Sequence, residues 1–172
     1  MNRIIYFRKY YSPVGNLILG DYNNQLCMCD WINGKKHFIN SFRLKQNLNV
    51  TFEEGDTSIL TEAFYQLGQY FTRRLSQFHL PLYLCGSDFQ KKVWHALMSI
   101  NYNEITTYRE IARRIGHPTS VRAVANAIGS NPISIIIPCH RVIGSNGSMT
   151  GYAGGIEIKK ALIDLESGLY LQ

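Results

Sequence analysis

The stretch of residues 133–143 constrains this chain most, because reactive side chains come directly after an apolar run. The three isoleucines at 135–137 predict a short buried strand. Pro138 ends that run, since proline has no N–H for a strand ladder and favours extended geometry in the residue before it. A thiol, an imidazole and a guanidinium follow, on Cys139, His140 and Arg141. This arrangement would hold a cysteine rigidly at the edge of a core.

Cys139 is the first candidate for a reactive group. Thiolate is the nucleophilic form of cysteine, and a nearby His or Arg lowers the pKa of a cysteine. A buried, inert structural cysteine is the competing interpretation, since free cysteine is commonly buried. The surrounding sequence must decide between the two.

The composition indicates a folded protein. The 172 residues are 45% hydrophobic and 17% charged, which is enough for one large domain or two small ones. No apolar run approaches the ~20 residues of a membrane span, and the N-terminus lacks the long apolar region of a signal peptide. We therefore expect no membrane association and an intracellular, cytoplasmic location, where the four cysteines would be free thiols.

The net charge of +6 and the pI of about 9.2 permit a polyanionic partner such as nucleic acid. The charge does not locate a binding face, however. Residues 1–85 hold nine Lys and Arg against six Asp and Glu, and residues 86–172 hold the same numbers.

The first half of the chain predicts a small domain built on an antiparallel sheet. Three β-prone segments separated by turn residues predict a meander of strands at 3–11, 17–19 and 26–32. Residues 35–56 show no clear pattern, and we expect a partly irregular connection there. Apolar residues at helical spacing then predict a helix over 58–75, followed by an extended linker. We place the two domains at 1–85 and 86–172.

The second half predicts helices. Apolar spacing, together with start and stop residues, places them over 88–98, 108–115, 119–129 and 156–167. Ser87 can cap the first helix. Thr107 and Glu110 form a capping box for the second, and Gly116 ends it.

The two short helices over 108–115 and 119–129 are joined by a tight turn, which suggests a helix-turn-helix. The apolar face of the later helix should point to the core, with Val121, Val124, Ala125 and Ile128. Its opposite face carries small residues and one long cation, which would let the helix approach a duplex closely: Arg122, Ala123, Asn126 and Ala127. A plain pair of packed helices with a solvated arginine explains the same pattern, and stays open on pattern alone.

Several motifs in this order resemble the O6-alkylguanine-DNA alkyltransferases, also called methylated-DNA–protein-cysteine methyltransferases. The motifs are Pro138-Cys-His-Arg-Val142, Thr107-Tyr-Arg-Glu-Ile-Ala112, Arg122-Ala-Val124, Asn131-Pro132 and Gly151-Tyr-Ala-Gly-Gly155. Five ordered motifs are far more specific than any one, and they favour a reactive over an inert cysteine. The resemblance covers residues 57–168 well and the first 56 weakly.

The resemblance implies an α+β fold. A small N-terminal domain with an antiparallel, ribonuclease H-like sheet would precede a mostly helical C-terminal domain with a winged-helix-like helix-turn-helix. The reaction of the family is direct-reversal DNA repair, in which an alkyl group moves irreversibly from guanine O6, and less well from thymine O4, to a cysteine. The damaged base must first leave the stack. The implied partner is double-stranded DNA with an alkylated guanine, bound by a monomer that acts once.

By resemblance, Cys139 is the nucleophile, His140 takes its proton through a water, and Glu166 orients His140. Tyr108 would rotate the nucleotide and protonate the departing base, while Asn131 would brace the active-site turn. The implied DNA-binding residues are Arg122, which fills the vacated space, Ala123, Asn126, Ala127, Tyr108 and Arg141. The implied base pocket is formed by Val142, Tyr152, Ala153 and Gly154.

Displacement at an alkyl carbon needs a soft nucleophile and a proton for the leaving base, so we expect no metal and no organic cofactor. A zinc site in the first domain is the alternative. Cys27 and Cys29 would lie on one face of a strand, and His37 and Cys85 could join them. The spacing lacks the paired ligand knuckles of a structural zinc site, which argues against it.

Two other functions compete with alkyl transfer. A non-catalytic lesion sensor of the same fold would carry another residue in place of Cys139. A regulator that reads sequence would carry several long polar side chains on the helix over 119–129, where this chain has mostly small ones. The chain also departs from many family members at Asn101, Asn103 and Thr107, where Pro, Gly and Ser are common. None of these departures removes a catalytic group.

Overall fold

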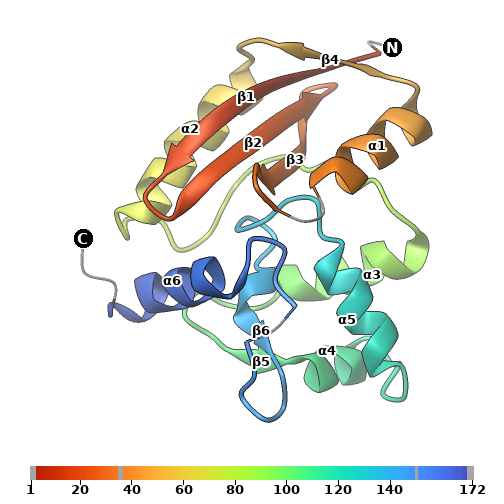
Figure 1. The fold of residues 1–172 in the computed structure, drawn as a ribbon, viewed down its shortest axis with the longest axis vertical. Helices are drawn as coiled ribbons and strands as arrows, with labels where there is room; N and C mark the ends of the chain where they lie inside the picture. Colours follow the sequence, from red (N-terminus) through yellow and green to blue (C-terminus); the bar gives the residue numbers. More distant parts are fainter. Residues whose placement is uncertain (1–2, 35–36, 150, 170–172) are drawn as a thin grey trace. The chain divides into compact units, whose positions relative to one another are not determined.

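The computed structural model describes residues 3–34, 37–149 and 151–169, and its chain divides into two compact units between Cys85 and Gly86. The first unit holds a four-stranded sheet and two helices, and the second is mostly helical with a two-stranded sheet (Figure 1). This confirms the predicted α+β class. Within the described ranges, none of the helices has the length and apolar character that a membrane span requires.

The sheet of the first unit is mixed. Its strands are β1 (Ile4–Ser12), β2 (Gly15–Tyr22), β3 (Gln25–Trp31) and β4 (Thr51–Glu54), in the order β3-β2-β1-β4. β1, β2 and β3 form the predicted antiparallel meander. β4 pairs in parallel with β1, so the sheet is not purely antiparallel. The backbone of Leu26 on β3 bonds to Pro81 and Tyr83, and these bonds cover the outer edge of that strand.

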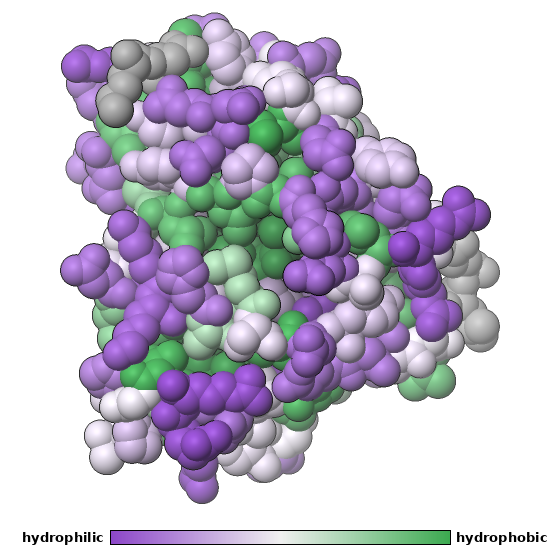
Figure 2. Space-filling view, turned by 180° about the vertical axis from the view of Figure 1, so that it is seen from behind, coloured by the Kyte–Doolittle hydropathy of each residue, from purple (hydrophilic) through white to green (hydrophobic). Residues whose placement is uncertain are grey.

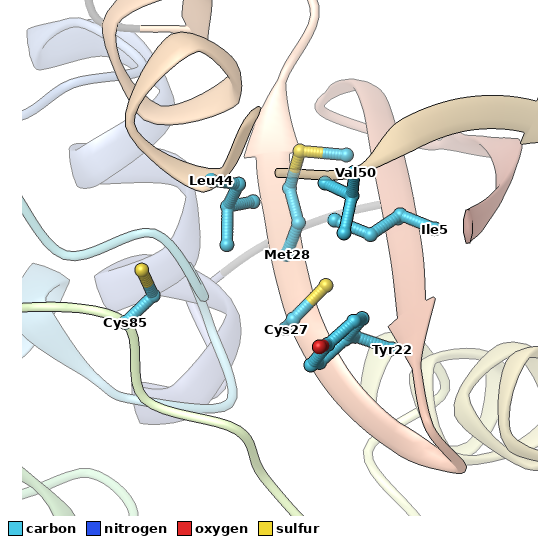
Figure 3. Packing of buried hydrophobic residues seen from close by; sticks show 7 residues of the cluster. All are labelled: Ile5, Tyr22, Cys27, Met28, Leu44, Val50 and Cys85. Carbon is cyan, nitrogen blue, oxygen red and sulfur yellow. The ribbon is translucent and has the colours of Figure 1, made fainter. Parts of the chain in front are cut away.

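Helix α1 (His37–Leu48) and strand β4 show that the expectation of an irregular connection over 35–56 is wrong for its described part, which begins at residue 37. The apolar residues of α1 do not share one face, because Leu44 is buried whereas Ile39 and Phe42 are exposed. This explains why the pattern was unclear. Leu44 joins α1 to the sheet through a buried cluster that includes Ile5, Met28 and Val50 (Figure 3).

Helix α2 (Ser58–Phe71) contacts β1, β2 and β3. Thr57 caps its start by accepting a hydrogen bond from Leu60 N. The helix ends four residues before the predicted end at 75. Thr72 closes the last turn on the Gly68 carbonyl, and Arg73 then adopts a left-handed φ of 60°, which a helix cannot continue through.

The second unit contains the four predicted helices, each within two residues of its expected ends. They are α3 (Asp88–Met98), α4 (Tyr108–Arg114), α5 (Val121–Gly129) and α6 (Ile156–Ser167). α3 begins with a full capping box between Ser87 and Gln90. The Trp94 indole N–H donates to the Ala127 carbonyl at 2.9 Å and fixes α3 against α5. α3, α4 and α5 contact one another, as a helix-turn-helix with a supporting helix requires.

A short parallel pair of strands lies beside these helices. β5 (Thr106–Thr107) pairs with β6 (Val142–Ile143). β5 leads directly into α4, and β6 directly follows the 3-10 helix η1 (Cys139–Arg141). The pairing therefore brings the start of α4 close to the segment that carries the candidate nucleophile.

Large apolar side chains also reach the surface. Figure 2 shows hydrophobic areas between hydrophilic groups on one face of the molecule. Among the exposed large apolar residues are Tyr11, Ile39, Phe42, Tyr65, Ile156 and Leu169. They lie on several different elements, so an apolar surface alone does not mark the functional site.

Candidate active site

The segment before Cys139 is a series of tight turns and not the predicted buried strand. Ile136 N bonds to Ser134 O at 2.8 Å, and Cys139 N bonds to Ile137 O at 2.8 Å. Ile135 has a left-handed φ of 69°, a strained conformation for a β-branched residue. The isoleucines are buried, as a core run should be. An apolar run thus indicates burial, but it does not by itself fix the backbone conformation.

Asn131 holds this turn segment from within the core. Its Oδ1 accepts from Ile133 N at 2.9 Å, and its Nδ2 donates to Ile137 O at 2.9 Å. The same Nδ2 donates to Cys139 Sγ at 3.2 Å. One buried amide therefore fixes two backbone groups of the turn and contacts the sulfur.

Cys139 is the first residue of η1, and 6% of its surface is exposed. It lines a narrow pocket together with Tyr108, which begins α4, and with Ile128 and Gly129, which end α5. The remaining lining residues are Asn131, Gly151, Tyr152, Ala153 and Lys159. The space between these side chains is narrow and leaves no room for even a water-sized molecule. Both helices of the helix-turn-helix therefore contribute to the pocket that holds the thiol.

His140 is fully buried, and its ring bonds to α6. Nε2 lies 2.6 Å from Glu166 Oε1. Because an ionised carboxylate only accepts hydrogen bonds, Nε2 carries the proton and Nδ1 keeps its lone pair. Nδ1 has no hydrogen-bond partner in the described part of the chain. This is the arrangement that a general base requires.

The electrostatics of this pair favour an ionised glutamate and a neutral histidine. Burial by itself would raise the pKa of the Glu166 carboxyl, but the bond from His140 and the pair with Arg141 outweigh burial and lower that pKa to about 2. Burial lowers the pKa of the His140 ring, and the charges of Arg141 and Lys159 lower it further, against the opposing effect of Glu166. His140 is therefore able to accept a proton at neutral pH.

Arg141 corrects one of the expected DNA contacts. Its surface is 5% exposed, and its guanidinium is directed inward. Nε bonds to Glu166 Oε2 at 2.9 Å, Nη2 bonds to Glu166 Oε1 at 3.0 Å, and Nη1 bonds to Ile100 O at 2.7 Å. A guanidinium that is buried and bonded in this way cannot reach a phosphate, so the placement of Arg141 among the DNA-binding residues is wrong.

Lys159 lines the pocket, and the sequence interpretation did not include it. The residue is 1% exposed, and its Nζ donates to Val142 O at 2.5 Å. The same ammonium lies 5.7 Å from the centroid of the Tyr108 ring. Burial lowers the pKa of Lys159, and the nearby Cys139 opposes that shift. Its position three residues before Leu162 and seven before Glu166, on the inward face of α6, is the signal that could have identified it.

The exposed face of α5 contains three of the four residues that the sequence placed on it. Arg122, Ala123 and Asn126 are exposed, and in the described part of the chain no hydrogen bond or ion pair holds the Arg122 side chain. Ala127 is 4% exposed and packs inward, so its placement on the same face is wrong. The turn of the helix carries residue 127 toward α3, where its carbonyl accepts the Trp94 bond.

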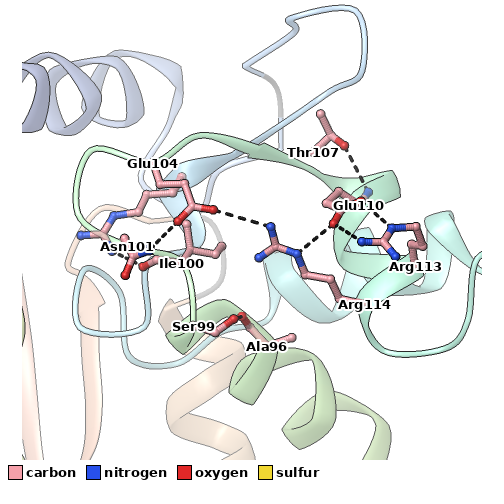
Figure 4. Close-up of polar contacts among 10 residues, drawn as sticks. Ala96, Ser99, Ile100, Asn101, Glu104, Thr107, Glu110, Arg113 and Arg114 are labelled. Carbon is pink, nitrogen blue, oxygen red and sulfur yellow. Dashed lines mark hydrogen bonds and ion pairs between the residues drawn. The ribbon is translucent and has the colours of Figure 1, made fainter.

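The start of α4 is fixed by side chains. Thr107 Oγ1 accepts from Glu110 N at 3.1 Å, which is one half of the predicted capping box. The other half is absent, because the Glu110 carboxylate binds Arg113 at 2.7 Å and Arg114 at 3.0 Å instead (Figure 4). Arg114 also lies 3.6 Å from Glu104 in the preceding turn. These contacts hold Tyr108 at a defined position at the edge of the pocket.

The other predicted pocket residues lie at different depths. Tyr152 and Ala153 line the pocket. Val142 is fully buried below it and contributes its carbonyl to Lys159, and Gly154 follows Ala153 outside the lining. The structure therefore brings two of the four expected residues to the pocket surface.

The three cysteines of the first unit form no evident metal centre. In the described residues, which exclude the His37 side chain, there is no group of three or more His, Cys, Asp or Glu residues that could hold a metal ion. Figure 3 shows Cys27 and Cys85 within a cluster of apolar side chains. Burial raises the pKa of Cys27 and of Cys29, so both are expected to be protonated.

Comparison with known proteins gives two family matches. The ribonuclease-like domain of 6-O-methylguanine DNA methyltransferase matches residues 5–84, and the DNA binding domain of the same family matches residues 88–168. Together they span nearly the whole chain.

Individual relatives agree with these matches. The methylated-DNA–protein-cysteine methyltransferase of Methanosarcina barkeri is 43% identical over 162 residues, which is 94% of this chain and 97% of that protein. The crystal structure of Mycobacterium tuberculosis O6-methylguanine methyltransferase has a TM-score of 0.81 and 39% identity, over 98% of this chain and 95% of that one. The structure of Mycobacterium tuberculosis OGT in complex with DNA has a TM-score of 0.82 and 39% identity, over 95% and 94% of the two chains. The chain therefore belongs to the 6-O-methylguanine DNA methyltransferase family.

Proposed function

We propose that this chain repairs DNA by moving a methyl or other alkyl group from O6 of guanine to the thiol of Cys139. The observation that carries the proposal is the position of Cys139 in a pocket whose walls include the first residue of α4 and the last residues of α5. A helix-turn-helix that forms part of the pocket of a nucleophile couples DNA binding to attack on a base. The activity named for the Methanosarcina relative supports the same reaction.

The reaction is a displacement at the alkyl carbon. The sulfur of Cys139 forms a C–S bond as the C–O bond to guanine breaks, and the departing guanine takes up a proton. His140 accepts the thiol proton at Nδ1 through a water, and Glu166 stabilises the imidazolium that results. Burial, and then the nearby Cys139, raise the pKa of Tyr108, so the phenol stays protonated and can supply the proton to the base. Asn131 keeps the sulfur in place.

The target base has to leave the duplex before this chemistry can occur. We propose that α5 lies along the minor groove, with Ala123 and Asn126 toward the DNA backbone and Arg122 in the space that the base vacates. The base would then enter the pocket between Tyr108 and the 151–154 loop. A purine is larger than the present narrow space, so this loop would move outward on binding.

The product is a thioether, which thiol exchange does not reverse. Each protein molecule would therefore act once, as a monomer, on double-stranded DNA, without a metal or an organic cofactor. Transfer from O4-alkylthymine would be slower. The protein would work inside the cell, where it has access to DNA.

The test is to incubate the protein with an excess of duplex that carries one O6-methylguanine, and to map the methyl group by peptide mass spectrometry. We expect one methyl group per protein, on the peptide that contains Cys139. Cys139→Ser should bind the duplex and accept no methyl group. Cys85→Ser is the matched control and should accept one, because Cys85 lies in the core of the first unit. Repeated turnover, or a methyl group on another residue, would contradict the proposal.

A further inference from the structure

The Arg141 side chain joins three separate segments of the active site. It belongs to η1, and two of its nitrogens bind Glu166 on α6 at 2.9 and 3.0 Å. Its third nitrogen binds the Ile100 carbonyl, at the end of α3, at 2.7 Å. Every bond is made inside the protein, so Arg141 has a role other than contact with DNA.

The Glu166 carboxylate depends on these bonds for its orientation. Oε1 takes the bonds from His140 Nε2 and Arg141 Nη2. Oε2 takes the bonds from Arg141 Nε and from Asn103 N, the latter at 3.1 Å. The two-pronged contact of a guanidinium fixes the plane of a carboxylate, which a single donor does not. Arg141 therefore determines which oxygen of Glu166 is presented to His140.

We propose that Arg141 is a positioning residue for alkyl transfer: it holds the Glu166 carboxylate against His140 and ties the turn at 100–103 to the segment that carries the nucleophile. This inference rests on the proposed transfer to Cys139. The turn at 100–103 leads through β5 into Tyr108. Arg141 therefore influences the position of His140, the proposed base, and also the position of Tyr108, the proposed proton donor. Its neighbour Asn103 has a left-handed φ of 60°, and its N–H is aimed at Glu166.

The charge of Arg141 affects how readily His140 can accept the proton of Cys139. In the intact site the arginine and Glu166 form a neutral pair, and the step from thiol and neutral imidazole to thiolate and imidazolium leaves the net charge unchanged. Without the arginine, Glu166 is a buried anion beside a neutral His140. It would draw a proton from solvent onto the Glu166–His140 pair, and that pair could no longer accept the proton of Cys139.

The other groups around His140 do not replace the lost charge. Lys159, on α6, is the remaining cation that acts on the ring, but its ammonium is bonded to Val142 O. Tyr108 on α4 lies beside that ammonium, and the Tyr102 ring lies 5.7 Å from the Arg141 guanidinium. Burial raises the pKa of Tyr108, so its phenol carries no charge that could replace the arginine. Loss of Arg141 therefore leaves a site in which Cys139 must lose its proton to solvent and create a buried negative charge.

The experiment measures the single-turnover rate of methyl transfer from O6-methylguanine duplex as a function of pH, from about pH 5 to about pH 9.5. Arg141→Met removes the charge and keeps much of the volume. Arg141→Lys keeps the charge and removes the two-pronged contact. Arg74→Met, an exposed arginine of the first unit, is the matched control. Native folding of each variant is checked by its urea unfolding curve.

We expect Arg141→Met to transfer more slowly at every pH, because the two-pronged contact is lost, and its pH–rate profile to move up on the acid side by at least about one pH unit, which adds at least about tenfold slowing on the acid limb. Arg141→Lys should transfer more slowly at all pH values with little movement of the profile. In a Glu166→Gln background, where no carboxylate is left to draw a proton onto the pair, Arg141→Met should move the profile less than it does in the wild-type protein.

Several results would overturn the proposal. These are slowing of Arg141→Met by one factor at every pH with no movement of the profile, wild-type rates in both variants, or a profile that moves as far in the Glu166→Gln background as in the wild-type protein. If Arg141→Met does not fold, Arg141→Lys decides, since a wild-type rate there means that the two-pronged contact is not needed. Failure of the transfer proposal itself looks different, because the wild-type protein and Arg74→Met would then transfer no methyl group at any pH.

Discussion

Replacement of Asn131 by alanine should separate the role of this residue in the fold from its role at the sulfur. The substitution removes three hydrogen bonds, to Ile133 N, Ile137 O and Cys139 Sγ. Ile137 O keeps a second bond, from Cys139 N, so it remains partly satisfied. The Ile133 N–H loses the partner that Asn131 gave it. A buried unsatisfied donor costs about 1–3 kcal/mol and a lost second bond about 0.5–1.5 kcal/mol, so we expect a destabilisation of about 2–4 kcal/mol.

The effect on the reaction is a separate quantity. A hydrogen bond to a charged group contributes about 1.5–3 kcal/mol, and each 1.36 kcal/mol corresponds to a factor of ten. Loss of the bond from Nδ2 to a thiolate at Cys139 should therefore slow transfer by about tenfold to a hundredfold at neutral pH. Asn131→Asp keeps an acceptor for Ile133 N–H but places a carboxylate oxygen beside Ile137 O and the sulfur. It should be slower still, because two negative charges would then be adjacent.

Two measurements on the same preparations test this reasoning. Urea unfolding gives the loss of stability, and single-turnover transfer to Cys139 gives the rate. Asn16→Ala, at an exposed position of β2, is the control and should change neither. If Asn131→Ala loses stability but keeps its rate within about threefold of wild type, the bond to sulfur contributes nothing to the reaction. If Asn131→Asp is faster than Asn131→Ala, the charge argument fails.

Three further predictions follow from the geometry. Arg122→Ala should slow transfer from duplex by about tenfold and leave transfer from a free alkylated guanine unchanged, since only the duplex needs base flipping; equal slowing of both would refute this. Gly151→Ala should slow transfer, because Gly151 has a φ of +89° and an added Cβ would lie 3.2 Å from the Tyr108 hydroxyl oxygen. Gly147→Ala is its control, with a φ of +82° and open space around the Cβ. Finally, acid should destabilise the fold, as measured by urea unfolding. The folded-state pKa of Glu166 is lowered to about 2, so its stabilisation is present above about pH 4.5 and is lost as pH falls toward 2. The lowered pKa of His140 adds a loss below about pH 6.5. Unchanged stability from neutral pH to about pH 3 would contradict both assignments.

The helices of the second unit could be predicted because their signals are local. Apolar spacing identified α3 and α6, and the side chains of Ser87 and Thr107 cap α3 and α4 where the sequence placed those starts. β4 could not be predicted in this way. It is short and polar, and it is a strand because it pairs with β1, which lies far away in sequence. Propensity within a few residues carries no information about such a partner.

The candidate site was predictable in its residue types and less so in their orientations. The motif with Cys139 and His140 identified the correct segment, yet Arg141 points into the core and Ala127 packs against α3. In both cases the deciding factor is a contact from a distant element, α6 for the arginine and Trp94 for the alanine. A helical wheel or a motif gives the neighbours of a residue along the chain, and it does not give the element that packs against it.

The backbone around the nucleophile is held by side chains rather than by regular secondary structure. Asn131 binds two backbone groups of the turn before Cys139, Arg141 binds the Ile100 carbonyl, and Lys159 binds the Val142 carbonyl just after η1. Each of these three residues is buried and polar, and Arg141 and Lys159 bond to backbone that lies far from them in sequence. A regular strand at 135–137 would have had its backbone groups paired by a neighbouring strand, but that ladder would also have fixed the direction of the residue after Pro138. Turns that are held by hydrogen bonds from buried side chains can instead place a thiol at the wall of a pocket formed by the two helices of the helix-turn-helix. The sulfur geometry therefore depends on a few buried polar contacts, and changes to them should affect methyl transfer far more than they affect binding of the duplex by α5.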